Sequence, residues 1–420
     1  MTTDLVPRAV RQRWSTGSEL LRLLHAEPGI TRTDAADRLA LSSSSITELI
    51  ERLRSAELLS ERRASPTGRG RPTGLLGAHP RGPLVIVVDL AAAQWRVLLG
   101  DLVGSISEVG AGSYDALEPA DFLPRIANVV ARAATRAEGR ARAVAAVAGT
   151  VSATRLLQFS SRGWHDTDLS VLTGGLPAGS DLPLLVGNDA TLGGLTEART
   201  GAARGAPAAL HLLVAVGVGG VLLINGQPVT GTSGAGGEYG HLPFGDPALP
   251  CPCGAYGCWD VTVDGRALAR QLGHDPPGDP ISYAHRLLDE LADGSPDPRA
   301  RDAVAHVSYA LGSGIAALVN LHDPDLTTIA GLAPRIRAAA PQAFADGYHR
   351  GLMAFHRRQP PPVRDSRHDD EAPLHGALTL GVDHLTSPAA LARWCRTRPS
   401  QPGHGRQVTA TRPAPLSRPT

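Results

Sequence analysis

The hydrophobic positions of residues 14–60 recur with helical spacing and divide into three short helices. The first lies in "TGSELLRLLHAEPG" (16–29) and ends at its Pro-Gly pair. The second opens at Thr31 and has Asp34 three residues later, which is the spacing of a capping box. The third lies in "SSSSITELIERLRSAELL" (42–59) and places four aliphatic side chains on one face: Ile46, Leu49, Ile50 and Leu53.

The segment that follows, residues 57–80, fits a two-stranded wing with Arg69 and Arg71 at its tip. Three short helices and a wing indicate a winged helix-turn-helix DNA-binding domain over 14–80. An ordinary helical bundle with a solvated basic loop would share the pattern. Arginines flanked by glycine favour DNA, because they can enter a narrow minor groove. The exposed start of the third helix would then face base edges or phosphates through Ser43, Ser44, Ser45 and Thr47.

From residue 84 the pattern changes to apolar runs of strand type that alternate with alanine-rich helical runs. "GPLVIVVDLAAAQWRVLLGDLVG" (82–104) predicts a strand, a turn and a second strand, and "DFLPRIANVVARAATRAEG" (121–139) predicts a helix. This alternation indicates an α/β fold over 84–390. Residues 395–420 contain proline and arginine, no acid and almost no large apolar residue, which predicts a disordered tail.

Charge and composition narrow the classes of protein. The 420-residue chain has a formal net charge of +1, so no global field attracts nucleic acid, although a local patch could. All 41 basic residues are arginine, which excludes mechanisms that need lysine, including a P-loop. The first 14 residues lack an apolar signal core, and no stretch has about 20 consecutive apolar residues. We therefore expect a cytoplasmic protein that makes no membrane contact.

Three of the four cysteines lie within eight residues, at 251, 253 and 258. A secreted domain held by disulfides is small and rich in cysteine, whereas this chain is long and poor in it. In a reducing compartment, clustered cysteines more often indicate a metal site or catalysis. A set of reduced, buried cysteines is the alternative.

Three motifs resemble one family. They are "VGNDATLGGL" (186–195), "GAGGEYGHLPF" (234–244) and "CPCGAYGCWD" (251–260), and they are similar to segments of the ROK family of sugar kinases and winged-helix sugar repressors. The resemblance spans about residues 14–390. It implies a winged helix-turn-helix followed by a two-lobed α/β domain of the actin-like, ribonuclease-H-like ATPase type.

The resemblance also implies a zinc site in a loop at 241–258. The ligands carried over from the family are His241, Cys251, Cys253 and Cys258. Zinc takes four tetrahedral ligands from thiolate and imidazole groups, and a closed Cys₃His set leaves no position for water. One structural zinc ion per chain is therefore expected beside the ligand cleft.

A sugar site is implied by the same motifs. Asn188 and Asp189 match the family's sugar-binding asparagine and the aspartate that acts as base in kinases, and Glu238 and His241 match further sugar contacts. Asp260 stands where the family has a glutamate and is one methylene shorter. In "SSRGWHDTDL" (160–169), which resembles a loop that closes on the sugar, an arginine replaces the usual asparagine at position 162.

The phosphate segments depart from the kinase pattern. "DLAAAQ" (89–94) has alanines where kinases resemble D-x-G-G-T, "AVGVGG" (215–220) has Val216 at a threonine position, and "IAGLAP" around Gly331 keeps one glycine of a pair. Each change removes a hydrogen-bonding group or backbone access that ATP needs. We therefore expect no ATP binding and no enzyme activity.

These observations predict a sugar-responsive transcriptional regulator. We expect a repressor of carbohydrate-related genes that binds an inverted-repeat operator as a homodimer or dimer of dimers. One alternative is a ROK-type kinase that phosphorylates a hexose or amino sugar. Another is a regulator that has lost its sugar response, which the departures at Asp260 and residue 162 favour.

Overall fold

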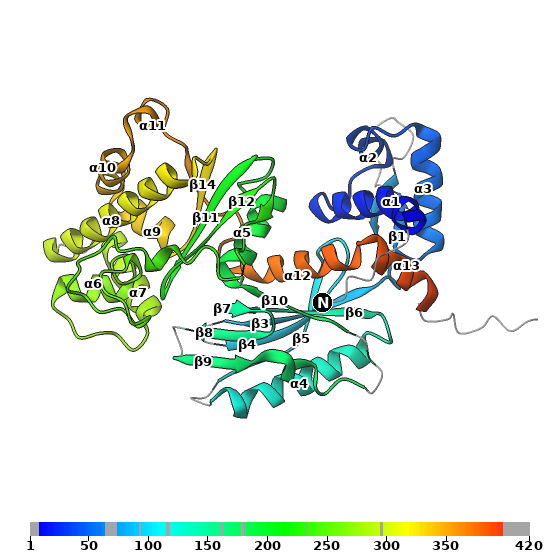
Figure 1. Cartoon of the computed structure of the whole chain (residues 1–420), viewed down its shortest axis with the longest axis horizontal. Coiled ribbons are helices and arrows are strands. Elements are labelled where there is room, and N and C mark those ends of the chain that lie inside the picture. The colour runs from blue at the N-terminus through cyan, green and yellow to red at the C-terminus, as the bar shows by residue number, and fades with distance from the viewer. Residues whose placement is uncertain are drawn as a thin grey trace, which may run out of the picture.

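A computed structural model of the chain describes residues 8–63, 74–91, 94–114, 118–159, 163–177, 180, 182–232, 234–294 and 297–397. Five residues singled out in the sequence therefore lie outside the described part: Arg69, Arg71, Ala92, Ala93 and Arg162. The described residues form a winged helix-turn-helix and a two-lobed α/β domain (Figure 1), which confirms the predicted architecture.

The N-terminal part has the predicted three helices and wing, namely α1 (Arg8–Ala26), α2 (Arg32–Arg38), α3 (Ser43–Ser55), β1 (Leu59–Arg63) and β2 (Gly74–Ala78). The Thr31 hydroxyl caps α2 by accepting a hydrogen bond from the Asp34 amide at 3.1 Å, as its spacing predicted. Helix α1 begins at Arg8 rather than near residue 14. It does so because Val10 and Trp14 already pack into the core of this region.

The first lobe is a five-stranded sheet of order β10-β6-β3-β4-β5. Alternate side chains of β3 lie on opposite faces of this sheet, because successive residues of a strand point to opposite sides. Ile86 and Val88 pack under α4, whereas Val85 and Val87 pack under α12. The bounds of the elements are β3 Leu84–Leu90, β4 Gln94–Gly100, β5 Ile106–Ser113, α4 Pro119–Arg136, β6 Ala141–Ala148, β10 Leu184–Asn188 and α5 Asp189–Arg199.

A small three-stranded sheet, β7-β8-β9, extends the first lobe toward the cleft. Its elements are β7 Thr150–Ser152, β8 Arg155–Phe159, β9 Trp164–Asp168 and the 3-10 turn η1 Leu169–Thr173. Of the segment at 160–169 that was expected to be a loop, residues 163–169 are described, and five of them, Trp164–Asp168, form a strand. Trp164 forms that strand because its ring is buried against Tyr114 and Phe122.

The second lobe is another five-stranded sheet, of order β13-β12-β11-β14-β15. Its strands are β11 Ala208–Ala215, β12 Gly217–Ile224, β13 Gln227–Pro228, β14 Leu326–Gly331 and β15 Val363–Asp365. Its helices and 3-10 turns are η2 Tyr239–His241, η3 Trp259–Val261, α6 Gly265–Leu272, α7 Pro280–Ala292, α8 Pro298–His322, α9 Leu332–Ala339, α10 Pro341–Gly351 and α11 Ala354–Arg358.

Helix α8 is the one described helix that is long and apolar enough to cross a membrane by length and composition. Of its most apolar window, 56% is buried inside the protein. Val307, Leu311 and Ile315 of this helix belong to the core of the second lobe. Its apolar character is thus explained by packing.

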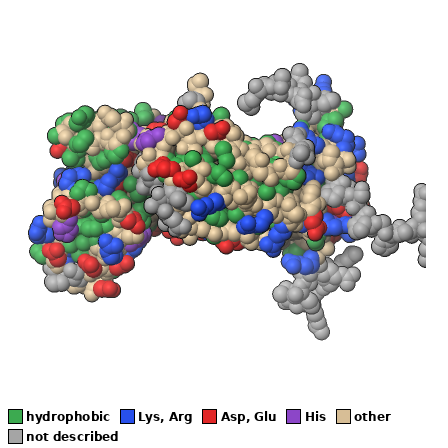
Figure 2. Space-filling view, turned by 90° about the horizontal axis from the view of Figure 1, so that it is seen from below, with side chains coloured by type: hydrophobic (Ala, Val, Ile, Leu, Met, Phe, Trp, Pro, Cys, Tyr) green, Lys and Arg blue, Asp and Glu red, His purple; other side chains and the backbone are tan. Residues whose placement is uncertain are grey.

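On the face shown in Figure 2, acidic and basic side chains are interspersed, in keeping with the net charge of +1.

Two C-terminal helices, α12 (Ala372–Leu385) and α13 (Pro388–Thr397), return to the winged helix (Figure 1). The 3-10 turn η4 (Asp369–Glu371) precedes α12. Helix α13 continues to Thr397, so residues 395–397 of the expected tail are helical, and the rest of that tail lies outside the described residues. Trp394 anchors α13: the indole Nε1 donates to the Ala56 carbonyl at 2.8 Å, and the ring lies 4.6 Å from the Arg142 guanidinium.

Helix α12 also contacts α1 directly. His25 of α1 is buried, and its Nε2 lies 2.9 Å from the Thr379 hydroxyl on α12. One turn later, Asp383 is paired with Arg22 at 3.4 Å and with Arg199 of α5 at 2.8 Å. Burial lowers the pKa of His25 to about 4, so this ring is neutral at physiological pH. The winged helix therefore rests on the first lobe through a packed, partly polar joint.

Candidate functional site: a cleft between the lobes and an adjoining cysteine cluster

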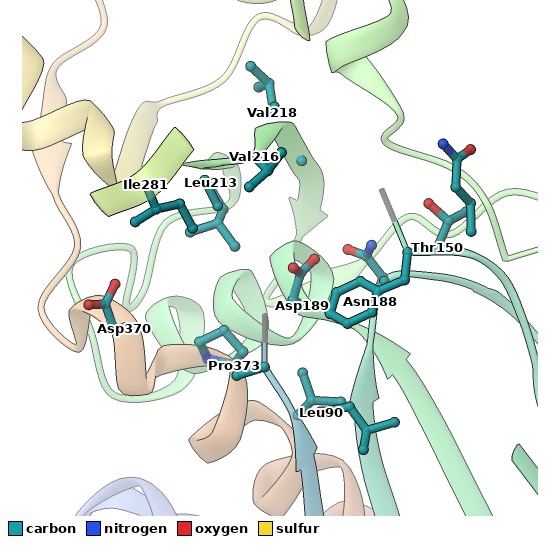
Figure 3. Close-up of a pocket in the computed structure, with 18 of the residues that line it drawn as sticks. Leu90, Thr150, Asn188, Asp189, Leu213, Val216, Val218, Ile281, Asp370 and Pro373 are labelled. Carbon is teal, nitrogen blue, oxygen red and sulfur yellow. The ribbon is translucent and has the colours of Figure 1, made fainter. Parts of the chain in front are cut away.

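A cleft of about 370 Å³ opens between the two lobes. Both lobes contribute side chains to it, mainly from strand ends and loops. Figure 3 shows Asn188 and Asp189 pointing into the space from the first lobe, with Leu213, Val216 and Ile281 across it. Polar lining residues include Asp89, Arg96, Thr150, Asn188, Asp189, Glu238, His241, Asp260, Asp370 and Glu371.

Asn188 and Asp189 lie where β10 ends and α5 begins. The Asn188 side chain caps α5 by accepting from the Thr191 amide at 3.1 Å, and Asp189 Oδ1 accepts from the Ala190 amide at 2.7 Å. Burial raises the pKa of Asp189 to about 6, and the charge of Glu238 adds to this effect. A carboxyl group with a pKa close to neutrality is suited to accept a proton from a ligand hydroxyl.

Glu238 and His241 reach the same cleft from the second lobe, on and beside the short turn η2. The Thr150 hydroxyl of the first lobe donates to Glu238 Oε1 at 2.9 Å, which joins the lobes across the cleft. His241 Nε2 lies 3.9 Å from Glu238 Oε2. The structure thus brings together four of the predicted sugar residues, Asn188, Asp189, Glu238 and His241, although they come from separate segments.

Asp260 also lines the cleft, but both of its oxygens already have protein partners. Oδ1 accepts from the Val218 amide at 2.8 Å, and Oδ2 pairs with Arg266 at 3.0 Å. The side chain is 7% exposed, and Gly217, with φ of +100°, lies against it. Asp260 therefore holds the turn between β11 and β12, and its predicted sugar contact stays a prediction.

The other end of the cleft contains three charged residues that are bonded to one another. Arg96 Nη2 and Nε donate to Asp89 Oδ2 at 2.7 and 3.1 Å, and Arg96 Nη1 donates to Glu371 Oε1 at 3.0 Å. Burial raises the pKa of Asp89, and the Arg96 guanidinium opposes this effect. We name this set the Arg96 triad.

Sequence reasoning missed Arg96 and Glu371. A local signal existed for Arg96, because it pairs with Asp89 directly across the two antiparallel strands β3 and β4. No comparable signal existed for Glu371, which is 275 residues away in the chain. Ala91 and Val216 also line the cleft, and they stand at the sequence positions expected to have lost phosphate contacts.

The four predicted metal ligands converge beside the cleft. The ligand atoms of His241, Cys251, Cys253 and Cys258 all lie within 4.8 Å of one another. Cys253 Sγ lies 3.7 Å from Cys258 Sγ, and Cys251 Sγ lies 3.8 Å from His241 Nδ1. Tetrahedral zinc with Zn–S bonds of about 2.3 Å places its ligand atoms about 3.7 Å apart, so the set fits zinc.

The chemistry of these donors supports the same fit. In the absence of a cation, burial and the neighbouring thiols raise the pKa of Cys258 to about 12. A bound cation is what would favour thiolates there. His241 presents Nδ1 to the cysteines and Nε2 to Glu238, so a metal on Nδ1 would fix the imidazole that borders the cleft.

The predicted DNA-contact residues of α3 are exposed. Ser43, Ser44, Ser45 and Thr47 lie on its first turns, with the opposite face of the helix buried. The Thr47 hydroxyl donates to the Ser43 carbonyl at 2.7 Å, and Arg32 of α2 donates to the Thr47 hydroxyl at 3.3 Å. This surface offers hydroxyl groups and one guanidinium group, which suits phosphate and base edges.

The fold and the cleft define a DNA-binding winged helix joined to a two-lobed domain of the actin-like sugar kinase type. The sequence profile of the ROK family matches residues 85–384, and a winged helix-turn-helix DNA-binding profile matches residues 16–59. The chain belongs to the ROK family.

Among curated proteins, a glucokinase from Halalkalibacterium halodurans is 32% identical over 182 residues, which are 40% of this chain and 54% of that protein. An N-acetyl-D-glucosamine kinase from Citrobacter koseri is 32% identical over 224 residues, 50% of this chain and 70% of that protein. The chain therefore spans about half the length of the glucokinase it matches.

Two solved structures illustrate the fold. A ROK family transcriptional regulator, described as a homolog of the E. coli MLC protein, has a TM-score of 0.70 at 20% identity and covers 92% of this chain and 99% of its own. A ROK family glucokinase from Streptomyces griseus, in complex with glucose and AMPPNP, has a TM-score of 0.57 at 26% identity. It covers 71% of this chain, and the match includes 98% of that glucokinase.

Proposed function

We propose that this protein is a sugar-responsive transcriptional regulator, a cytoplasmic repressor of carbohydrate-related genes. It would bind an inverted-repeat operator as a homodimer or dimer of dimers. The observation that carries the proposal is that one chain joins a DNA-binding winged helix to a ROK cleft, with a single helix, α12, touching both.

Helix α12 provides a physical path between the two sites. Pro373, in its first turn, lines the cleft, and Glu371 just before it does so too. Further along, Thr379 and Asp383 contact His25 and Arg22 of α1. A sugar that favours one closure of the lobes would shift α12 and with it the winged helices, which is a population shift between two arrangements.

The sugar side of the cleft supports the choice of ligand. Asn188, Asp189, Glu238 and His241 offer amide, carboxylate and imidazole groups around one cavity. Each hydroxyl of a sugar both donates and accepts hydrogen bonds, so such a mixture suits a polyol. One structural zinc ion, held by His241 and the three clustered cysteines, would keep the histidine in place.

A ROK-type sugar kinase is the second candidate, because Asp189 has the raised pKa and position of a general base and the curated relatives above are kinases. Phosphoryl transfer depends on positioning the donor. We expect Ala91 and Val216 to disfavour that donor, because they lie in the segments that resemble the phosphate segments of the kinases, and the Arg96 triad includes Asp89 of the first of these segments. Sugar-dependent ADP formation, abolished by Asp189→Ala, would establish the kinase; an absence of ADP would support the regulator.

The DNA-binding half of the proposal is tested on α3. Ser44→Glu places a carboxylate on the exposed first turn, where it suits the helix dipole but repels DNA phosphates. Binding to an operator selected from random DNA should weaken at least about tenfold, as measured by fluorescence anisotropy. Thr135→Glu, on the exposed side of α4, is the matched control and should bind as the wild type does. Equal binding by both variants would rule out α3 as the contact.

A further inference from the structure

Phosphate recognition in proteins needs a cation or a set of free amides at the site. Among the described residues that line the cleft, Arg96 is the one arginine, and the sequence contains no lysine. Its Nε and Nη2 both donate to Asp89, and its Nη1 donates to Glu371. The guanidinium thus faces two carboxylates and is held by both.

The two carboxylates differ in how firmly they hold Arg96. Asp89 is 5% exposed and sits on β3 directly opposite Arg96, so its contact is built into the sheet. Glu371 lies at the mouth of the cleft, and its side chain is 50% exposed. Glu371 is therefore the partner that a competing anion would have to displace.

The surroundings of the Arg96 triad are also acidic. Asp189, Glu238 and Asp370 line the same cleft, and no arginine pairs with them among the described residues. The charge of Asp89 reaches Asp189, since it contributes to the raised pKa of that residue. A phosphate ester entering this space would meet like charges and a cation that is already neutralised, and such contacts discriminate strongly between ligands.

We propose that the effector is an uncharged sugar, and that the Arg96 triad excludes the corresponding sugar phosphates. Glu371 is the specificity-determining residue, because it occupies the Arg96 donor that phosphate would use. This inference rests on the proposed sugar-sensing role of the cleft, and it concerns which chemical form of the sugar is sensed.

The test compares matched pairs of ligands on the purified full-length protein by isothermal titration. The pairs are glucose, N-acetylglucosamine, mannose and fructose, each with its 6-phosphate. At least one free sugar should bind, and its 6-phosphate should bind at least about 100-fold more weakly. A 6-phosphate that binds as tightly as its free sugar, or more tightly, would overturn the inference.

A pair of variants distinguishes the effect of the Arg96 triad from the effect of removing any negative charge near the cleft. Glu371→Gln removes the exposed carboxylate that holds Arg96, so the ratio of the two dissociation constants should fall about tenfold. Asp369→Asn removes the same charge two residues earlier, from an exposed aspartate outside the cleft lining, and should leave the ratio unchanged. An unchanged ratio in Glu371→Gln, or an equal fall in both variants, would refute the role of Glu371.

Failure of this inference can be told from failure of the proposed function. If no sugar and no sugar phosphate binds, the inference falls together with the sensing role. DNA binding and its loss in Ser44→Glu would still stand as evidence for a regulator. If a 6-phosphate is the tight ligand and releases the operator, the regulator is upheld and the inference alone is wrong.

Discussion

The charged side chains at the two ends of the cleft differ in whether they are bonded to one another. At one end, Asp189, Glu238 and His241 face the cavity and keep part of their hydrogen-bonding capacity for a ligand. At the other end, Asp89, Arg96 and Glu371 satisfy one another. The difference shows that charges in one cleft can be satisfied within the protein at one place and left available at another.

The largest expected effect concerns the cluster of His241, Cys251, Cys253 and Cys258, which adjoins the first end of the cleft through His241. Cys253→Ser removes one of four ligands, and structural zinc contributes on the order of 10 kcal/mol to folded domains. We expect the ion to be lost, as measured by atomic absorption, with a fall in melting temperature of the ROK domain and weaker sugar binding.

Cys395→Ser is the matched control for that substitution. Cys395 lies on α13, far along the chain from the cluster, and the variant should keep one zinc ion per chain and the wild-type melting temperature. Full zinc occupancy in Cys253→Ser would remove Cys253 from the ligand set.

The substitution Arg96→Gln removes the ion pair with Asp89 at the other end of the cleft. It leaves the buried Asp89 carboxylate without its cation, and removing one partner of a buried pair costs about 3 kcal/mol. Urea unfolding at pH 7.5 should show this loss. In the double variant Asp89→Asn/Arg96→Gln most of the stability should return, since neither residue of the pair then carries a charge. A double variant as unstable as the single one would show that the pair is not what stabilises this end.

The substitution Asp189→Asn should have a smaller effect, on how the stability of the protein depends on pH. Because the folded-state pKa of Asp189 is raised to about 6, its ionised form is disfavoured in the folded protein, and wild-type stability falls as pH rises from about 4 to 6. The variant should therefore be more stable than the wild type by about 3 kcal/mol above pH 6, with the advantage vanishing near pH 4.

The same substitution should weaken sugar binding, so stability and function would move in opposite directions. Thermal melts at pH 5 and pH 8, together with calorimetric titrations, measure both effects. Asp275→Asn changes an exposed aspartate of the second lobe and should alter neither. If Asp189→Asn has the same stability as the wild type at pH 8, burial does not disfavour the ionised form of Asp189.

Local spacing explains which features the sequence could predict. The capping pair Thr31 and Asp34, the aliphatic face of α3 and the cluster of three cysteines are each determined within a short segment, where chain geometry fixes which side chains meet. The family resemblance added Asn188, Asp189 and Glu238, because their motifs are contiguous.

The boundaries and partners that the sequence missed depend on contacts across the fold. Helix α13 extends through residue 397 because Trp394 reaches Ala56, more than 300 residues earlier. Asp260 is occupied because folding places Val218 and Arg266 beside it. No periodicity or motif predicts such a contact, since the energy of a side-chain contact depends on distance in space and not on separation along the chain.

The sequence by itself determined that this protein has a winged helix, an α/β domain of the ROK type and a cysteine and histidine cluster in one loop. Only the tertiary structure decided that Glu371 meets Arg96 and that α12 joins the cleft to α1. The physical reason is that a charged side chain buried in a cleft must find its counter-charge from whatever segment packs there. Here that segment is the start of α12, which only the folded chain brings to β4.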